Sequence, residues 1–360
     1  MPSWKDLKKN PGLWRNLILR SEIISAVREF FSKKGFLEVN TPLLLPAVIP
    51  ESYLDVFSTY LKNRRGIKKR MFLAASPEAS IKKMLVSINR NCFEITKSFR
   101  NGETDSNLHN PEFTILEWYR LKADYKKIIS DCQDLILHIY NKISEKFPDQ
   151  PNFKHSFPPV IRYRNSSINL SAPWKKISIK KALEKYSGIS FADITGGQDS
   201  ADPFTPDRIT AFARKKGYSF SLNTTWEQLF NQIYLNEIEP NLVKYGKPVI
   251  IYDFPKPLAA LAKVKKGDNR LVERFEFYIG GIELGDCYTE LTDFREQKNR
   301  FEKNIREIKK YNKTAIYPDQ EFLECLKTGL PECAGIAVGL DRLVMLFADL
   351  ADIKDTIFYG

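Results

Sequence analysis

The feature that most constrains this chain is a pair of strand-like segments on either side of a polar loop. Residues 92–99 (CFEITKSF) alternate apolar and polar side chains, and residues 112–121 (EFTILEWYRL) are rich in aromatic and β-branched types. The segment between them is rich in Asn, Asp, Ser and Gly, which is typical of a turn. The sequence therefore predicts two antiparallel strands joined by a polar loop.

The second of these strands has an unusual mixture of side chains on one face. Residues two apart share a face of a strand, so Phe113, Ile115, Glu117 and Tyr119 lie together. Arg100 follows the first strand. Burying a carboxylate is costly unless a cation or hydrogen-bond donors meet it. Two interpretations stay open at this point: Glu117 meets a cationic or polar ligand, or it forms a structural ion pair at a half-solvated sheet edge.

The composition is that of a folded protein outside the membrane. With 360 residues, 43% hydrophobic and 28% charged, the chain can build one large domain or two smaller ones. No apolar run is long enough to cross a bilayer, and the N-terminus lacks the apolar segment of a secretory signal. We therefore expect a cytoplasmic protein that does not bind a membrane.

The cysteines, histidines and net charge narrow the classes of site. The five cysteines form no CxxC pair and the three histidines have no ligand-like spacing, so neither a disulfide scaffold nor a zinc site is expected. A formal charge of +12 predicts attraction to an acidic partner, either nucleic acid or protein. The densest basic run, KNRRGIKKR at residues 62–70, indicates an exposed hairpin tip, for which a solvated turn that only aids solubility is the alternative.

The N-terminal part predicts helix, strand and helix. Apolar residues at helical spacing predict a helix over 14–34, and residues 36–45 are typical of a strand. Further on, Ser76 is expected to cap a helix that opens with Pro77. Glu78 then falls in the first turn, where the helix dipole favours a carboxylate.

Residues 123 to about 240 are the least informative part. Helical patches alternate there with polar segments that contain proline, and there is no repeat and no low-complexity tract. We expect a peripheral helical insertion and not a separate enzyme domain.

A second acidic segment follows a buried-strand pattern at residues 249–255. In a regular strand Asp286, Tyr288 and Glu290 share one face. Carboxylates interleaved with aromatic side chains suit a lysine-like ammonium group, which needs acceptors, and Mg²⁺, which binds hard oxygen ligands beside nucleotide phosphates. An ordinary exposed strand face is the alternative.

The glutamates upstream in this segment depend on two glycines. Glu276 and Glu283 would lie on opposite faces of a regular strand. Gly280 and Gly281 between them permit a bulge that could bring both carboxylates to one face.

The last segment, residues 333–357, predicts a glycine-bearing strand that runs into an amphipathic helix. Arg342 emerges near the start of that helix. A planar guanidinium suits both phosphate binding and stacking on a base, and glycines permit close approach of the backbone to a nucleotide.

These motifs carry a resemblance to a known family. The string FRN at 99–101 followed by HNPEFTILEWY at 109–119 resembles motif 2 of the class II aminoacyl-tRNA synthetases, specifically of the lysyl branch. Residues 14–45 resemble motif 1 and residues 333–357 resemble motif 3. The resemblance implies an α+β fold with an antiparallel sheet flanked by helices, a single catalytic domain over residues 1–360, and a homodimer built at motif 1.

The resemblance also implies roles for individual residues. The ATP site would consist of Arg100, Asn101, Glu103, His109, Asn110, Phe113, Glu283, Leu284, Gly339 and Arg342. Arg100 and Arg342 would be catalytic, and Phe113 and Arg342 would sandwich the adenine. The amino-acid substrate would be held by Ser76, Pro77, Glu78, Glu117, Tyr119, Asp286, Tyr288 and Glu290. Glu276 and Glu283 would bind Mg²⁺ together with ATP.

The chain departs from the lysyl pattern at three places. Asp286 and Cys287 stand where the family usually has Asn-Gly, and the added charge could favour a doubly charged substrate. Gly102 separates Asn101 from Glu103, so that Glu103 would take over the role of the expected glutamate. Ala337 replaces the middle glycine of motif 3, a substitution that is a feature of the synthetase paralogues that modify elongation factor P.

Because motif 1 begins almost at the N-terminus of this sequence, we expect no N-terminal OB-fold anticodon domain. The sequence therefore resembles the elongation factor P β-lysine ligase family. That resemblance implies activation of (R)-β-lysine, or lysine, as an aminoacyl-adenylate and its transfer to a lysine of elongation factor P, an acidic protein; tRNA is not expected as a partner. The alternatives are a truncated lysyl-tRNA synthetase-like enzyme with tRNA or another amine as acceptor, and a non-catalytic binding protein.

Overall fold

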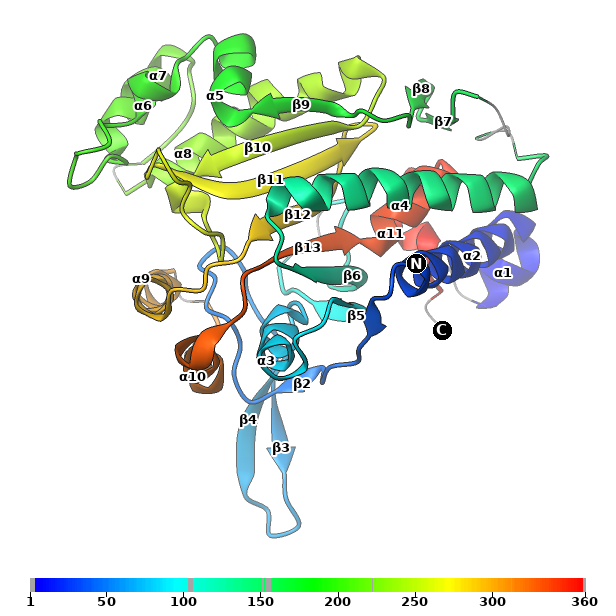
Figure 1. The fold of residues 1–360 in the computed structure, drawn as a ribbon, viewed down its shortest axis with the longest axis horizontal. Helices are drawn as coiled ribbons and strands as arrows, with labels where there is room; N and C mark the ends of the chain where they lie inside the picture. Colours follow the sequence, from blue (N-terminus) through cyan, green and yellow to red (C-terminus); the bar gives the residue numbers. More distant parts are fainter. Residues whose placement is uncertain are drawn as a thin grey trace.

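An eight-stranded sheet organises the molecule (Figure 1). The computed structural model describes residues 4–102, 106–150, 152, 157–221, 223–311 and 313–358. In spatial order the strands are β1 (Leu37–Glu38), β5 (Cys92–Phe99), β6 (Glu112–Leu121), β13 (Cys333–Gly339), β12 (Ile282–Thr289), β11 (Leu271–Ile279), β10 (Val249–Pro255) and β9 (Lys175–Ser178). Neighbouring strands from β5 to β10 are antiparallel, and β1 and β9 join the edges in parallel. The predicted α+β class and antiparallel sheet are confirmed.

Three helices cover one face of the sheet and bury the main hydrophobic core. They are α2 (Pro11–Lys33), α4 (Tyr125–Lys146) and α11 (Leu340–Ala348). Large side chains such as Phe31 of α2 and Trp118 of β6 meet there in ring contact, 5.1 Å between centroids. Burial of such rings supplies much of the stability of a core.

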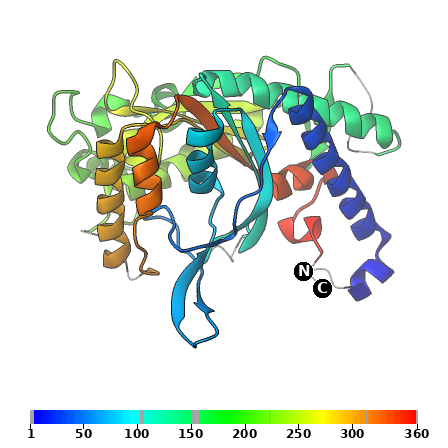
Figure 2. The same cartoon turned by 60° about the horizontal axis from the view of Figure 1, so that its bottom comes forward.

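The opposite face carries helices at its two ends. At the β1–β5–β6 end lie α3 (Glu78–Ile88), α9 (Phe294–Lys310) and α10 (Gln320–Gly329). At the β9–β11 end lie α5 (Ile179–Ala182), η1 (Leu183–Ser187), α6 (Phe191–Ile194), α7 (Pro206–Lys215), α8 (Trp226–Ile233), η2 (Tyr234–Ile238) and η3 (Glu239–Tyr245). Figure 2 shows the first group across the sheet from α2 and α11. Between these two groups of helices, the middle of this face opens into a cavity.

Besides a small three-stranded sheet, which is described below, the remaining elements are short. They are α1 (Trp4–Lys9), the hairpin of β7 (Val160–Tyr163) and β8 (Ser166–Asn169), and the helical turns η4 (Lys256–Leu258) and η5 (Ile353–Thr356). No helix in the described ranges is both long and apolar enough to cross a membrane.

The N-terminal predictions need two corrections. The expected strand over 36–45 is only two short pieces, β1 and β2 (Leu44–Leu45). Pro42 between them has no N–H to donate to a ladder, and the N–H of Thr41 donates instead to Oε1 of Glu94 at 2.8 Å. The helix expected to open at Pro77 begins one residue later, at Glu78, with Pro77 at the N-cap and no side-chain capping bond.

Residues 123–240 are less peripheral and less helical than predicted. Helix α4 is part of the main core, β9 is a strand of the main sheet, and β7 and β8 form a hairpin. Only residues 179–245 form a separate group of helices against one end of the sheet. The organisation as one domain stays a prediction.

The two glycines of the acidic segment form a turn and not a bulge within one strand. Gly280 and Gly281, with φ of 63° and 81°, connect β11 to β12. Left-handed backbone at both positions matches the tight turn that joins antiparallel strands. The register shifts by one residue at Leu284, the third residue of β12, and this shift places Glu276 directly opposite Asp286.

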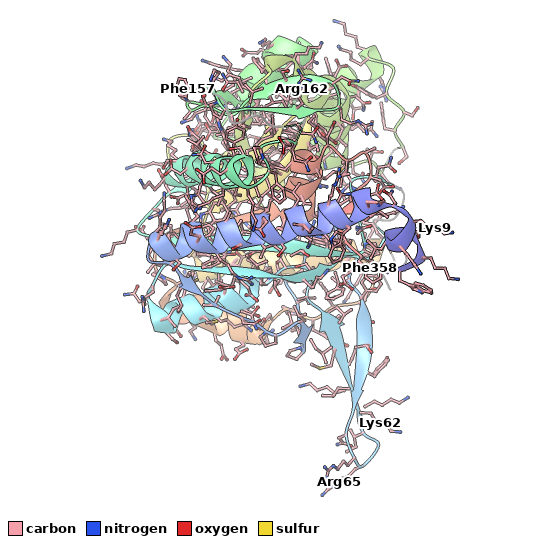
Figure 3. The ribbon with its side chains drawn as sticks, turned by 90° about the vertical axis from the view of Figure 1, so that its right-hand side faces the viewer. Lys9, Lys62, Arg65, Phe157, Arg162 and Phe358 are labelled. Atoms are coloured by element: carbon pink, nitrogen blue, oxygen red, sulfur yellow. The ribbon has the colours of Figure 1, made fainter. Side chains whose placement is uncertain are left out.

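The basic run lies at the tip of a projecting hairpin, as predicted. Strands β3 (Ser58–Lys62) and β4 (Lys68–Leu73) form it, and β2 completes a small sheet at its base. Lys62 and Arg65 are at its far end (Figure 3).

A buried ion pair ties α2 to α11 and β6. Arg20 pairs with Asp341 and donates to Oγ1 of Thr114 at 2.6 Å, while the N–H of Thr114 donates to Asp341 at 2.8 Å. Asp341 is buried, so Arg20 is the cation that balances its charge.

We expect Arg20→Met to lower the free energy of unfolding by about 3 kcal/mol, because Asp341 would be left buried and uncompensated. Urea denaturation measures this loss. Arg28→Met, on the same helix, removes an exposed pair with Glu38 and should cost less than about 1 kcal/mol. Equal losses in both variants would contradict the assignment.

Candidate active site

A cavity of about 1300 Å³ opens on the sheet face between the two groups of helices. Sixteen of the residues predicted for the site line it: Ser76, Glu78, Arg100, His109, Asn110, Phe113, Glu117, Tyr119, Glu276, Glu283, Leu284, Asp286, Tyr288, Glu290, Gly339 and Arg342. Pro77 and Asn101 do not line it, and Glu103 lies outside the described residues. Segments far apart in the sequence thus meet in one cavity, while the predicted roles of the residues stay predictions.

The register of the strands arranges the cavity floor in rows. One row of directly opposed residues crosses four strands: Glu117, Ala337, Asp286 and Glu276. The next row is Tyr119, Gly335, Tyr288 and Arg274. Opposed residues share a face of a sheet, so the carboxylates and phenols come together without any loop to position them.

The absence of a side chain at Gly335 leaves space for Tyr119 and Glu290. A Cβ at this position would collide with the ring of Tyr119 and with Oε1 of Glu290. The absence of a side chain therefore lets the phenol and the carboxylate lie directly against the backbone of β13.

The end of the cavity beside α3 contains a buried lysine that the sequence analysis missed. Lys82 of α3 is 1% exposed and pairs with Glu78 at 2.6 Å and with Glu290. Burial lowers its pKa, but the charges of Glu290 and Glu78 outweigh this effect and raise the pKa overall, so Lys82 is protonated. The spacing of four residues from Glu78 on a helix was the signal that could have found it.

Glu117 lies beside this lysine with no cation of its own. Its Oε2 accepts a hydrogen bond from the hydroxyl of Tyr119 at 3.0 Å, and no ion pair to it is seen in the described part of the chain. Burial, together with the charge of Glu78, raises the pKa of Glu117 well above its usual value. The described residues thus show no structural ion pair at Glu117, and its binding of a cationic ligand stays a prediction.

Asp286, the departure from the family pattern, is already paired. Arg274 contacts both of its oxygens, at 3.0 and 2.9 Å, and Tyr288 donates to it at 2.6 Å. Burial raises the pKa of Asp286 to about 6, although the charge of Arg274 opposes this effect. The added charge is therefore paired before any ligand binds, with a guanidinium that Asp286 shares with Glu276.

The other end of the cavity presents guanidinium groups. Arg342 donates to the carbonyl oxygens of Leu108 and Glu283, at 3.1 and 2.8 Å, and lies 2.8 Å from Nε2 of His109. These contacts fix the plane of the guanidinium. The guanidinium of Arg100, directly after β5, lies 5.2 Å from the ring centre of Phe113 on β6.

Asn110 adds an independent sign of a ligand. Its side chain is buried and lines the cavity, yet its amide nitrogen and oxygen have no hydrogen-bond partner among the described residues. Buried polar groups are rarely left unpaired, because this costs about 1–3 kcal/mol each. A polar ligand at this end would satisfy both atoms.

The predicted metal residues fit Mg²⁺ chemistry. Glu276 accepts bonds from Arg274, Tyr278 and Tyr234, which leaves part of its acceptor capacity free. Burial raises its pKa to about 7, against the effect of Arg274, and the charge of Glu283 adds to the rise. Neighbouring carboxylates that repel one another are stabilised by a cation.

A third carboxylate of this group was not foreseen. Burial and the charges of Glu283 and Glu276 raise the pKa of Glu239 to about 7. Nothing in the local sequence connects residue 239 with β11 and β12. In the described ranges no group of three or more His, Cys, Asp or Glu side chains is placed to hold a metal alone, and Mg²⁺ beside phosphates needs only one or two carboxylates.

Comparison with known proteins agrees with the architecture. Residues 3–360 match the family of class II tRNA synthetases (D, K and N). The chain is 33% identical to the lysine–tRNA ligase of Carboxydothermus hydrogenoformans, over 98% of this chain and 67% of that protein. It is 32% identical to the elongation factor P–(R)-β-lysine ligase of Haemophilus influenzae strain PittGG, over 96% of this chain and 95% of that protein.

The antiparallel sheet and its cavity thus define a class II synthetase catalytic domain. The chain belongs to the class II tRNA synthetase family of the D, K and N branch. Its relatives are named as ligases, and it is an ATP-dependent, adenylate-forming ligase related to the lysyl-tRNA synthetases.

We expect Gly335→Ala to raise the KM for the amino-acid substrate about tenfold, or about 1.4 kcal/mol, because the added methyl displaces Tyr119 and Glu290. Amino-acid-dependent ATP/pyrophosphate exchange gives the KM. Gly197→Ala is the control, since its Cβ would meet nothing within 4 Å. An unchanged KM in the first variant would show that the contact is not part of the substrate site.

Proposed function

We propose that this protein activates (R)-β-lysine, or lysine, with ATP and transfers the aminoacyl group to a lysine side chain of elongation factor P. The observation that carries the proposal is the charge balance at one end of the cavity. Glu78, Glu117 and Glu290 supply three carboxylates there, and Lys82 balances only one. Burial raises the pKa of both Glu117 and Glu290, so a cationic ligand would stabilise the negative charge of these two carboxylates.

A diamino acid fits this balance. Lysine and β-lysine each carry two ammonium groups, and each group needs a carboxylate and hydrogen-bond acceptors when water is removed. The hydroxyl of Tyr119 donates to Glu117 and the hydroxyl of Tyr288 donates to Asp286, so each phenol oxygen can still accept a hydrogen bond from an ammonium group. Because the Asp286 charge is paired with Arg274, it adds no third site for a cation.

The substrate carboxylate would then face the guanidinium end of the cavity. In the activation step its oxygen attacks the α-phosphorus of ATP and pyrophosphate leaves. Arg100 and Arg342 would stabilise the negative charge on the phosphates, and Asn110 would bind the nucleotide through its unpaired amide. Mg²⁺ held by Glu276 and Glu283 would supply further positive charge at the phosphates.

The second step is aminolysis of the adenylate. The neutral ε-amine of an acceptor lysine attacks the carbonyl carbon, an amide bond forms, AMP leaves and the amine loses a proton. No covalent intermediate with the protein is required. Elongation factor P is proposed as the acceptor for two reasons. A relative similar over 95% of its own length carries that name. Ala337, the substitution that resembles the paralogues that modify elongation factor P, stands in the row between Glu117 and Asp286.

A second candidate is transfer of the activated amino acid to tRNA. The 33% identity to a lysine–tRNA ligase and the formal charge of +12 favour it. The two functions share the activation step and differ only in the acceptor. The cytoplasmic location and the homodimer stay predictions.

We expect amino-acid-dependent ATP/pyrophosphate exchange to be strongest with (R)-β-lysine and weaker with α-lysine. The assay compares both β-lysine enantiomers, α-lysine and amino acids with one ammonium group, which leave a carboxylate of the pocket unpaired. Exchange with α-lysine alone would favour the second candidate. No exchange with any amino acid would contradict the activation step.

Arg342→Ala should abolish this exchange and leave the fold intact, because it removes a charge at the phosphates and not a core contact. Circular dichroism checks the fold. Arg162→Ala, at an exposed position of β7, is the matched control and should exchange normally. Normal exchange by Arg342→Ala would contradict the assignment of this end of the cavity to the phosphates of ATP.

A further inference from the structure

The projecting hairpin has a charge that the proposed chemistry does not use. We call residues 58–70 the basic arm: they comprise β3, the exposed half of β4 and the turn between them (Figures 1 and 3). The basic arm contains six Lys or Arg residues and no Asp or Glu, in a chain of net charge +12. Among the described residues, no ion pair joins any of these cations to a carboxylate.

One face of the basic arm concentrates this charge. Lys62 lies directly opposite Lys68, and Tyr60 directly opposite Arg70, on the same face. The Lys68 ammonium is 6.0 Å from the centre of the Tyr60 ring. Like charges directly opposite one another destabilise a hairpin, and an anionic partner would relieve this repulsion.

The basic arm also exposes apolar side chains. Tyr60, Leu61 and Ile67 are 62%, 52% and 64% exposed. Protein interfaces combine aromatic and apolar contacts with arginine, whereas contacts to a phosphate backbone need only donors and charge. The combination favours an acidic protein surface over a nucleic acid.

The root of the basic arm, where residues 58 and 70 join the rest of the chain, adjoins the cavity. Asp55, just before β3, accepts bonds from the backbone N–H and the side-chain amide of Asn101, both at 3.0 Å. Beyond β4 the chain continues directly to Ser76 and Glu78, which line the cavity. An extended strand advances about 3.3 Å per residue, so six residues of the basic arm span about 20 Å between its root and its tip.

We propose that the basic arm binds an acidic surface of the acceptor protein and so brings the acceptor lysine to the cavity. This inference rests on the proposed function and adds the surface that recognises the macromolecular substrate. The arm contributes to the second step only, because none of its side chains lines the cavity that holds the amino acid and nucleotide.

The test uses a triple variant, Lys62→Gln, Arg65→Gln and Lys68→Gln, in the full chain. All three side chains are exposed. The control triple variant, Lys176→Gln, Lys181→Gln and Lys215→Gln, removes the same charge from exposed positions on β9, α5 and α7, at the opposite end of the molecule (Figure 1).

We expect the arm variant to raise the KM for elongation factor P about tenfold with little change in kcat, and the difference from wild type to shrink as salt is added. ATP/pyrophosphate exchange should be unchanged in the arm variant. The control variant should match wild type in both assays.

Four results would overturn the inference. They are an unchanged KM, an equal effect in the control variant, an arm variant that loses only tRNA binding, and one that changes only its oligomeric mass. If wild type modifies elongation factor P and the arm variant does so equally well, the inference alone fails. If wild type exchanges but never modifies elongation factor P, the proposed function fails and the inference fails with it.

Discussion

The site depends on one buried cation, Lys82, held between two carboxylates from distant parts of the chain. Glu78 is one turn before it on α3, and Glu290 follows directly after β12. A buried ammonium is tolerated only when its charge is paired and its donors are satisfied. The pairing therefore fixes α3 against the sheet and at the same time sets the charge that the cavity offers to a substrate.

The register of the sheet positions the other side chains of the site. Side chains from four strands meet in rows because directly opposed residues share a face, and small residues on β13 keep the rows open. Gly335 admits Tyr119 and Glu290, and Ala337 lies between Glu117 and Asp286. Strands held in a sheet are more rigid than loops, so this geometry is well suited to pre-organised recognition of charged groups.

Local patterns predicted the elements that carry the site. The alternation around residues 92–121 and the strand-to-helix pattern around Arg342 depend on neighbours in sequence, and both are confirmed. The strand expected over 36–45 was wrong because Pro42 interrupts its ladder and Thr41 donates to Glu94 instead.

Long-range contacts explain what the sequence could not predict. Helical spacing connects Lys82 with Glu78 but cannot reveal Glu290, which approaches only after the sheet has formed. The same holds for Glu239, whose pKa is raised by burial and by the charges of Glu283 on β12 and Glu276 on β11. The partner of Asp286 was also hidden, since Arg274 reaches it only through the register of the β11–β12 hairpin.

The central claim is that the activated amino acid goes to a protein. The most direct measurement supplies the enzyme with ATP, labelled (R)-β-lysine or lysine, and equal concentrations of elongation factor P and tRNA in one reaction, and follows the label into each. The account predicts label in an amide bond to a lysine of elongation factor P and none above background in tRNA. Label in tRNA with none in elongation factor P would contradict it.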